Sequence, residues 1–104
     1  QDYKQAMYWY LKAAAQESVG AYVNIGYMYK HGQGVEKDYQ AAFEWFMKAA
    51  ECNDATAWYN LAIMYHYGEG RPVDLRQALD LYRKVQASGT RDVSQEIREI
   101  EDLL

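Results

Sequence analysis

The chain has 104 residues, half of them apolar and a quarter charged, which suits one folded domain and excludes an intrinsically disordered segment. The net charge of −4 comes from residues 92–104, because residues 1–91 hold ten acidic and ten basic side chains. Without a basic patch for the phosphate backbone, nucleic acid is not an expected partner. No apolar run of about 18 residues occurs, so insertion into a membrane is not expected either.

An internal repeat of 36 residues is the strongest pattern in the chain. Residues 2–37 and 38–73 are identical at 13 of the 36 aligned positions without a gap, with glycines and aromatic residues in phase. A period of this length indicates stacked supersecondary units. The apolar spacing predicts that each unit contains two helices.

Six helices and no strand are predicted in chain order: 2–17, 20–31, 38–52, 55–67, 74–87 and 92–103. The helices at 2–17, 38–52 and 74–87 each begin with an aspartate, whose carboxylate is expected to accept from the free N–H groups of the first turn. The helices at 20–31 and 55–67 are followed by Gly32 and Gly68, which suit the left-handed residue that closes a helix. Positive φ is therefore expected at both glycines.

The last predicted helix, 92–103, has a narrow apolar stripe and is otherwise polar. A helix of this kind terminates a stack of repeats, because no further neighbour covers it. Asp92 and Gln95 are expected to form its capping box. Four aromatic residues recur in phase on the core stripes of the other helices and are expected to pack inside the units: Trp9, Trp45, Tyr29 and Tyr65.

Residues 21–35 (AYVNIGYMYKHGQGV) and 38–50 (DYQAAFEWFMKAA) resemble the motif of the SEL-one-like repeat, a relative of the tetratricopeptide repeat. Unit length, glycine spacing and the aromatic pair all coincide with that motif, and the resemblance covers about residues 2–87. Ala62 departs from the motif glycine that is matched by Gly26. It is expected to push its neighbouring helices slightly apart.

The resemblance implies an all-α fold, a right-handed α-α solenoid of antiparallel helix pairs. The first helix of each unit in the family is called A and the second is called B. Residues 1–18 then hold an orphan B helix, 19–54 and 55–90 hold two full repeats, and 91–104 hold the capping helix. The whole is expected to be one helical-repeat domain, 1–104, from the C-terminal part of a longer array.

The A helices of tetratricopeptide-like solenoids line the concave surface, so the resemblance assigns ten residues to a partner-binding face: Val23, Asn24, Tyr27, Lys30, His31, Tyr59, Asn60, Ile63, His66 and Tyr67. Tyrosine suits such a face because it buries much area at low entropy cost and keeps a hydroxyl group. Asn24 and Asn60 recur in phase. Each amide is expected either to hold an extended peptide or to hold a neighbouring helix.

Reaction chemistry is not expected. The Gly-x-Gly pairs are interpreted as turns, because a phosphate-binding loop needs a preceding strand and a following Lys-Ser/Thr. His31 and His66 lack the further ligands that zinc requires, and Cys52 has no partner thiol and no basic neighbour in sequence. The sequence therefore predicts no metal, no cofactor and no enzyme.

The leading hypothesis is a protein–protein interaction module or adaptor that grips a peptide or a partner helix on the concave A-helix surface. The alternative is a structural spacer within a larger multidomain protein. A contiguous aromatic and polar patch on the A helices favours the first, and an evenly charged surface favours the second. The aromatic face of helix 2–17 lacks a preceding A helix, so either an upstream unit or a homodimer through this edge is also expected.

Overall fold

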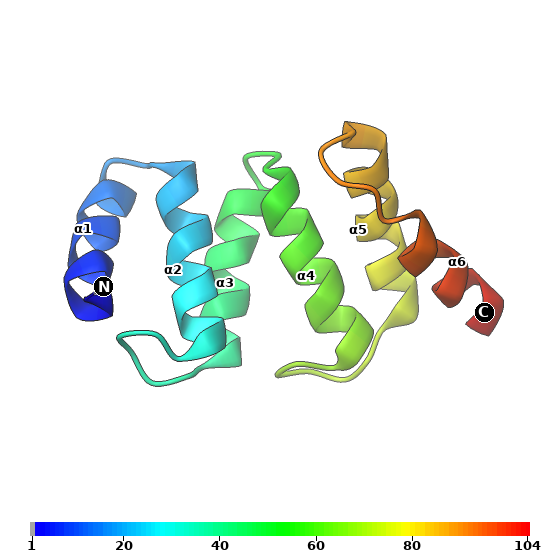
Figure 1. The fold of residues 1–104 in the computed structure, drawn as a ribbon, viewed down its shortest axis with the longest axis horizontal. Helices are drawn as coiled ribbons and strands as arrows, with labels where there is room; N and C mark the ends of the chain where they lie inside the picture. The colour runs from blue at the N-terminus through cyan, green and yellow to red at the C-terminus, as the bar shows by residue number, and fades with distance from the viewer. Residues whose placement is uncertain (1) are drawn as a thin grey trace. The chain divides into compact units, whose positions relative to one another are not determined.

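The computed structural model describes residues 2–104, which form six α-helices and no strand (Figure 1). The helices are α1 (Tyr3–Ala15), α2 (Val19–His31), α3 (Tyr39–Ala50), α4 (Ala55–Tyr67), α5 (Leu75–Ser88) and α6 (Ser94–Leu103). The all-α class and the six predicted helices are confirmed. Their bounds differ from the prediction by at most two residues, mainly because capping residues lie just outside the helical turns.

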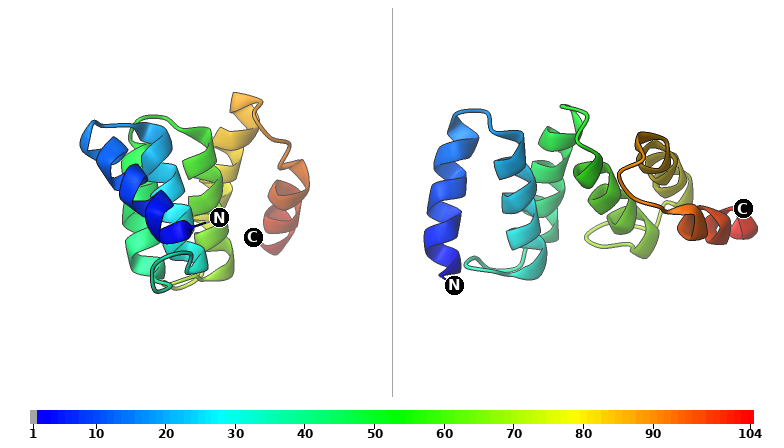
Figure 2. Two further views of the ribbon diagram at one scale, coloured as in Figure 1. Left: turned by 60° about the vertical axis from the view of Figure 1, so that its left-hand side comes forward. Right: turned by 45° about the horizontal axis from the view of Figure 1, so that its top comes forward.

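The chain divides into two compact units between Asp54 and Ala55. The first unit contains α1, α2 and α3, which run antiparallel to their neighbours, with α2 packed against both of the others (Figures 1 and 2). The second unit contains the antiparallel pair α4 and α5, and α6, which packs against α5. Each unit is therefore built by packing helices that follow one another in the sequence.

Aspartate residues cap the three B helices, as predicted. The carboxylates of Asp2, Asp38 and Asp74 accept hydrogen bonds from the backbone N–H three residues further on, at 3.2, 3.1 and 3.2 Å. All three residues have extended backbone conformations. Each cap satisfies one of the N–H groups that the first helical turn leaves without an intrahelical partner.

The connectors from A to B helices turn at glycine in both units. Gly32 and Gly68 have φ angles of 65° and 69°, which confirms the predicted left-handed positions. Backbone hydrogen bonds of 2.9 Å then return each connector to its A helix, from the N–H of Asp38 to the carbonyl of Tyr29 and from the N–H of Asp74 to that of Tyr65. The two connectors share this geometry although their sequences differ after the second glycine.

A second set of left-handed residues follows the B helices. Glu17, Asn53 and Gly89 stand at steps of 36 residues and have φ angles of 61°, 60° and 74°. Only Gly89 adopts this conformation without a steric penalty from a Cβ atom. The repeat therefore imposes one backbone conformation on three different side chains.

Each unit has its own apolar core. One cluster of buried residues in the first unit consists of Met7, Ile25 and Met28. A cluster in the second unit consists of seven buried residues from α4, α5 and the α6 region: Ala62, Ala78, Leu79, Tyr82, Val85, Val93 and Ile100. Tyr29, Trp45 and Tyr65 pack against these cores, as predicted.

The predicted packing of Trp9 is wrong, because its side chain is 58% exposed. The equivalent Trp45 of α3 lies beside Tyr22 of α2, with ring centroids 5.9 Å apart. Trp9 has no such helix before it in the described part of the first unit.

The predicted capping box of the last helix is also wrong. Val93 is the N-cap of α6 and makes no side-chain cap, while the Asp92 carboxylate accepts from the N–H of Ser94 at 3.0 Å. The N–H of Val93 donates to Oε1 of Gln86 on α5 at 2.7 Å, and the Val93 side chain is fully buried. The N-terminus of α6 is therefore held by the contact of Val93 with α5, and not by a capping box of Asp92 and Gln95.

Candidate functional site

The predicted binding residues of α2 divide between surface and interior. Asn24, Tyr27 and His31 are exposed, and Val23 is half-buried. The rings of Tyr27 and His31 lie 4.2 Å apart, one turn of helix from each other. These residues form a polar and aromatic strip along one side of α2.

Lys30 does not belong to this strip, because its side chain is only 8% exposed. It continues the row of Tyr22 and Gly26, which are spaced four residues apart and face α3. A Cβ atom on Gly26 would lie 2.8 Å from the ring of Phe46, so this row is in close contact with the paired helix. The assignment of Lys30 to an open binding surface is thus corrected.

Asn60 is corrected in the same way. Its side chain is 7% exposed, and its Nδ2 donates to the carbonyl of Thr56, one turn earlier in α4, at 2.9 Å. Of the two uses predicted for this amide, neither is observed, because the hydrogen bond is made within its own helix. Asn24, by contrast, keeps an exposed amide.

In the second unit, the predicted residues also contribute to packing. His66 Nδ1 lies 3.0 Å from the hydroxyl of Tyr82 on α5, and the Tyr59 ring packs against the same tyrosine with centroids 6.3 Å apart. Burial raises the pKa of the Tyr82 phenol far above its usual range, with Tyr67 and Glu96 adding to the rise. Ile63 is half-buried, and Tyr67 is exposed and stacks on His66.

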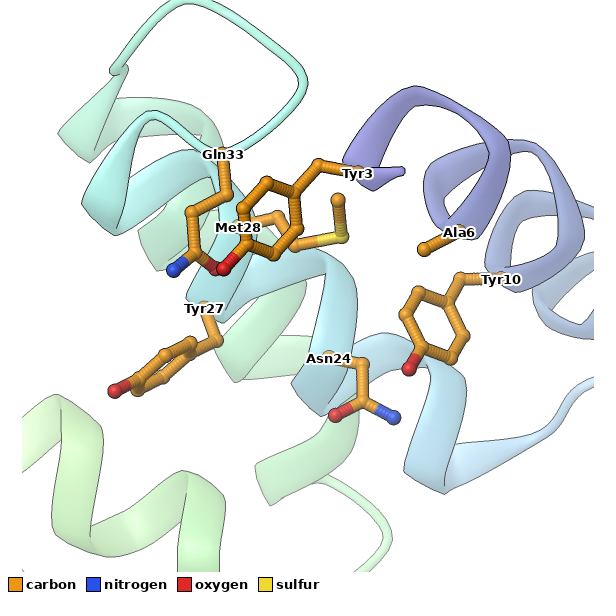
Figure 3. A pocket seen from close by; sticks show the side chains of 7 residues that line it. All are labelled: Tyr3, Ala6, Tyr10, Asn24, Tyr27, Met28 and Gln33. Atoms are coloured by element: carbon orange, nitrogen blue, oxygen red, sulfur yellow. The ribbon is translucent and has the colours of Figure 1, made fainter. Parts of the chain in front are cut away.

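A hollow of about 100 Å³ lies between α1 and α2 in the first unit (Figure 3). We call it the tyrosine–amide hollow, and seven residues line it: Tyr3, Ala6, Tyr10, Asn24, Tyr27, Met28 and Gln33. In Figure 3 the hydroxyl of Tyr10 points toward Asn24, and the ring of Tyr3 lies over Met28 beside Gln33. None of the lining residues carries a charge at neutral pH, so the hollow offers phenol and amide groups for hydrogen bonding without a charged acid or base.

The connector after α2 fixes one side of this hollow. Gly34 has a φ of 75°, and a Cβ atom on it would lie 2.7 Å from the carbonyl carbon of Tyr3. Only glycine allows this contact, which brings Gln33 next to the first turn of α1. The N–H of Gln33 also donates to the carbonyl of Met28 at 2.9 Å, which fixes its backbone.

Five lining residues were not predicted as site residues: Tyr3, Ala6, Tyr10, Met28 and Gln33. Tyr3 and Tyr10 are seven residues apart on the aromatic face of helix 2–17, which was expected to meet an upstream unit or a second copy of the chain. Gln33 lies in the glycine turn, where sequence spacing gives no side-chain direction. The sequence feature that could have indicated this hollow is the presence of two tyrosines on one face of an uncovered helix.

A second hollow, of about 90 Å³, lies in the second unit beside Tyr59. The guanidinium of Arg91 covers the Tyr59 ring at 4.1 Å from its centroid, in a cation–π contact. The other lining residues are Ala55, Thr56, Val85 and Thr90. Because Tyr59 is covered on one face by Arg91 and packs on Tyr82, it is less available to a partner than Tyr27.

Among residues 2–104, no cluster of three or more His, Cys, Asp or Glu side chains could hold a metal ion. Cys52 is an exposed free thiol. Among these same residues, no helix has the length and apolar character required to cross a membrane.

Comparison with solved structures gives close matches over most of the chain. A Sel1 repeat protein from Oxalobacter formigenes has a TM-score of 0.80 and 38% identity, over 86% of this chain and 36% of that chain. The protein c5321, a protective antigen of uropathogenic Escherichia coli strains displaying an SLR fold, has a TM-score of 0.82 and 36% identity, over 86% of this chain and 19% of that one.

A shorter match links the chain to the Sel1-repeat-containing protein YbeQ of Escherichia coli strain K12. The two are 96% identical over 24 residues, which are 23% of this chain and 7% of that protein. The chain therefore spans about a third or less of each of these relatives.

The sequence profile of the Sel1 repeat matches residues 1–18, 19–54 and 55–84. The matches follow the internal period, and by that period residues 1–18 correspond to residues 37–54, the second half of a unit. Sel1 repeats generally serve in protein–protein interaction and are typically not catalytic. Because the profile covers most of the sequence in phase with the repeat and the helices, this chain belongs to the Sel1 repeat family.

Proposed function

We propose that the chain is a protein-interaction module that binds an extended peptide segment of a partner protein in the tyrosine–amide hollow. The observation that carries this proposal is the meeting of three tyrosines and two amides around one uncharged hollow. Tyrosine combines a large apolar ring with a hydroxyl group, and it is enriched among the residues that dominate binding energy. The family's general role in protein interaction supports the same reading.

The size of the hollow favours a peptide over a small-molecule ligand. Its volume of about 100 Å³ is well below the roughly 300–1,000 Å³ typical of small-molecule and cofactor pockets. A peptide can place one side chain in such a hollow and continue along the surface on either side. The exposed strip of Asn24, Tyr27 and His31 on α2 provides that surface.

The chemistry of the lining residues gives each a role. The Asn24 carboxamide has both a donor and an acceptor, which match the C=O and N–H groups of an extended peptide backbone. The rings of Tyr3 and Tyr27 flank a bound apolar side chain, with Met28 below them. Met28 suits this position because its flexible thioether adapts to differently shaped side chains.

Selection from a displayed peptide library, with the full chain as bait, tests the proposal. Replacing Tyr27 by Ala is expected to weaken the selected peptides by about 1–2 kcal/mol, or roughly ten-fold in Kd, as for aromatic residues at binding hot spots. The Tyr27 side chain is 47% exposed, so the variant should keep its helical content and thermal midpoint. Affinity is measured by calorimetry with synthetic peptides.

Replacing Tyr8 by Ala is the matched control, because Tyr8 is equally a tyrosine, is 53% exposed and does not line the hollow. This variant should bind like the parent. If both variants bind equally well, the peptide site is elsewhere. If no peptide is selected, the alternative of a structural spacer is favoured.

A further inference from the structure

The hollow beside Tyr59 in the second unit differs in chemistry from the tyrosine–amide hollow. Its volume is about 90 Å³, and six residues line it: Ala55, Thr56, Tyr59, Val85, Thr90 and Arg91. We call it the arginine hollow. Its lining residues carry one positive charge, hydroxyl groups and no acidic side chain, whereas the lining of the tyrosine–amide hollow is uncharged. The arginine hollow therefore suits an anionic group better than a neutral one.

The loop after α5 brings Arg91 to this hollow by departing from the repeat. Arg91 lies 36 residues after Ala55, which is the first residue of α4. The next helix, however, begins only at Ser94. Arg91 is thus a loop residue at a position where the period predicts the start of a helix.

The polar groups of the arginine hollow are not part of the repeated pattern either. At a step of 36, Thr56 corresponds to Gly20 of α2, and Arg91 corresponds to Ala55. The helices α2 and α4 both form with an uncharged, apolar or absent side chain at the position in question. The fold of a unit therefore does not require the hydroxyl of Thr56 or the charge of Arg91.

Hydrogen bonds hold the loop that carries Arg91. Ser88 Oγ donates to the carbonyl of Val85 at 2.6 Å and accepts from the N–H of Thr90 at 3.3 Å. Because the Ser88 proton is used in this way, the Thr90 hydroxyl donates to Ser88 Oγ across the 2.9 Å that separate the two oxygens. The N–H of Val93 donates to a side chain of α5 at 2.7 Å. The loop is therefore bound to α5 on both sides of Arg91.

The guanidinium of Arg91 is positioned, and its hydrogen-bonding groups are available. Its central carbon lies 4.1 Å from the centroid of the Tyr59 ring, and stacking on a ring orients the planar group. Among residues 2–104, no carboxylate forms an ion pair with Arg91. The neighbouring Asp92 carboxylate instead accepts from the N–H of Ser94. A guanidinium has five N–H donors in a fixed plane, so Arg91 offers a fork of donors to a ligand.

The donors of the arginine hollow match a carboxylate better than a phosphate. A guanidinium binds the two oxygens of a carboxylate through parallel hydrogen bonds. The Thr56 hydroxyl is a further donor at the hollow, whereas the Thr90 hydroxyl is engaged with Ser88. A phosphate carries nearly two negative charges at neutral pH. Its second charge would be uncompensated, because residues 55–104 hold eight acidic and six basic side chains.

We propose that the arginine hollow binds the carboxylate of a glutamate or aspartate side chain in a partner protein. The fork of Arg91 holds the two carboxylate oxygens, and Thr56 donates a further hydrogen bond. The methylene groups of the bound side chain pack on Ala55, Val85 and the ring of Tyr59. This site does not depend on the peptide proposed for the tyrosine–amide hollow, because the two hollows share no lining residue and their ligands differ in charge.

The apolar part of the lining favours a side-chain carboxylate over the carboxylate at the end of a chain. A side-chain carboxylate is carried by methylene groups, which suit the apolar wall of the hollow. The carboxylate at a chain end is joined to a carbon atom that also carries a backbone amide, and burying this amide without a partner is unfavourable.

Titration of the isotopically labelled full chain with small probes tests the proposal. N-acetyl-glutamate α-amide carries its single charge on the side chain, and the corresponding glutamine compound is its neutral control. N-acetyl-alanine carries its charge at the chain end, and inorganic phosphate is the fourth probe. The backbone amide shifts of Thr56, Thr90 and Arg91 are followed by nuclear magnetic resonance at neutral pH and low ionic strength, where screening by salt is weak.

The glutamate probe is expected to bind saturably with a Kd on the order of 10 mM, because one carboxylate supplies a few charge-assisted hydrogen bonds. The glutamine probe should give no saturable shift. N-acetyl-alanine and phosphate should bind at least about five-fold more weakly than the glutamate probe, for the reasons of lining and charge given above.

Variants of the hollow assign the binding to its residues. Arg91→Gln should abolish saturable binding, and Arg91→Lys should weaken it about five-fold, since lysine keeps the charge but not the fork. Thr56→Val should weaken it about three-fold through the loss of one hydrogen bond. Arg76→Gln is the matched control, because Arg76 is also an exposed arginine of the second unit and does not line the hollow. The control should bind the glutamate probe like the parent.

Circular dichroism checks that the variants are folded, as expected for the exposed side chains of Thr56 and Arg91. Three results would overturn the proposal: no saturable shift with the glutamate probe, equal or stronger binding of N-acetyl-alanine or phosphate, or equal losses in Arg91→Gln and Arg76→Gln. If Arg91→Gln loses helical signal, Arg91→Lys and Thr56→Val decide, and undiminished binding in both would also overturn it.

Discussion

The α2–α3 pair places Gly26 against the ring of Phe46, whereas the α4–α5 pair has Ala62 and Tyr82 at the equivalent positions. The second pair thus holds an extra methyl group and an extra hydroxyl group in its interior. The hydroxyl has a partner, because His66 Nδ1 lies 3.0 Å from it. A buried phenol without such a partner would be unfavourable by about 1–3 kcal/mol. The comparison shows that the residue at a repeat position is matched in size and polarity to the side chains that it faces. The two helix pairs are therefore equivalent as groups of contacting residues, although single residues differ between them.

The largest effect is expected in the first connector, where a Cβ atom on Gly34 would lie closer to backbone atoms than one on Gly68 in the second connector. Gly34→Ala should destabilise the chain by about 2–4 kcal/mol, because a left-handed residue acquires a Cβ atom that overlaps the backbone of Tyr3. Gly68→Ala should cost only about 1 kcal/mol, since the nearest atom to its Cβ is a Val73 methyl group at 3.0 Å. Urea unfolding followed by circular dichroism measures both. Equal losses would show that the contact between the first connector and α1 is unimportant for stability.

Exchanging the small residue of each helix pair for that of the other pair tests this comparison further. Gly26→Ala is expected to cost about 1–2 kcal/mol, because overlap with the Phe46 ring outweighs the gain in helix propensity. Ala62→Gly is also expected to cost about 1–2 kcal/mol, through lost propensity and one lost buried methyl group. Both are measured by the same unfolding experiment. If either substitution stabilises the chain, its residue is not matched to the ring it faces.

A pH dependence should distinguish the second pair from the first. The pKa of Tyr82 is raised by burial, so the folded chain retains this proton at a pH where the unfolded chain loses it. Below about pH 10 the phenol is neutral in both states and its contribution to stability is complete. Above that pH, the folded state should lose up to about 1.4 kcal/mol of stability for each further pH unit.

Tyr82→Phe removes this titration and serves as the reference for it. Its stability should fall less steeply above pH 10 than that of the parent, while at neutral pH it should be less stable by about 1 kcal/mol through loss of the His66 contact. Parallel stability curves for the two proteins in alkaline solution would contradict the assignment.

The smallest effect is expected where the repeat imposes a left-handed backbone. Glu17→Gly should stabilise the chain by about 0.5–1 kcal/mol, because it removes the Cβ penalty at a φ of 61°. Asn53→Gly should have a smaller effect, since asparagine tolerates this conformation better than glutamate. Thermal unfolding of both variants checks the order, and Gly89 shows the residue type that the position accepts. A destabilised Glu17→Gly variant would mean that the side chain makes a favourable contact that exceeds the strain.

The sequence predicted the helices well because the signals are local. The aspartate caps, the glycine turns and the apolar stripes each act within one or two helical turns. The three caps and the two glycine turns were found where expected, whereas Trp9 of the first stripe is exposed. The cap of α6 could not be predicted this way. The N–H of its N-cap residue, Val93, donates to Gln86 of another helix, and no local pattern reveals that bond.

Only some of the residues assigned to the binding face are exposed, because the family motif places residues on the A helices without showing which side chains of other helices cover them. Lys30 and His66 occupy the row that meets the paired B helix, and Asn60 bonds within α4, so these three are unsuited to an open surface. Asn24 and Tyr27 were placed on the accessible side of α2. The hollow beside them also required the close approach of Gly34 to Tyr3, which depends on tertiary contact.

The connectors also have a consequence for how fast the chain folds. The side chains that join paired helices are close in sequence: His66 and Tyr82 are 16 residues apart, and Arg83 and Glu101, which form a 2.8 Å ion pair, are 18 apart. Short separations mean that little chain entropy is lost before a pair of helices forms its first contacts. Helical proteins with such low contact order fold in microseconds to milliseconds. Each antiparallel pair is therefore able to act as a folding nucleus, and growth from it proceeds by adding neighbouring helices.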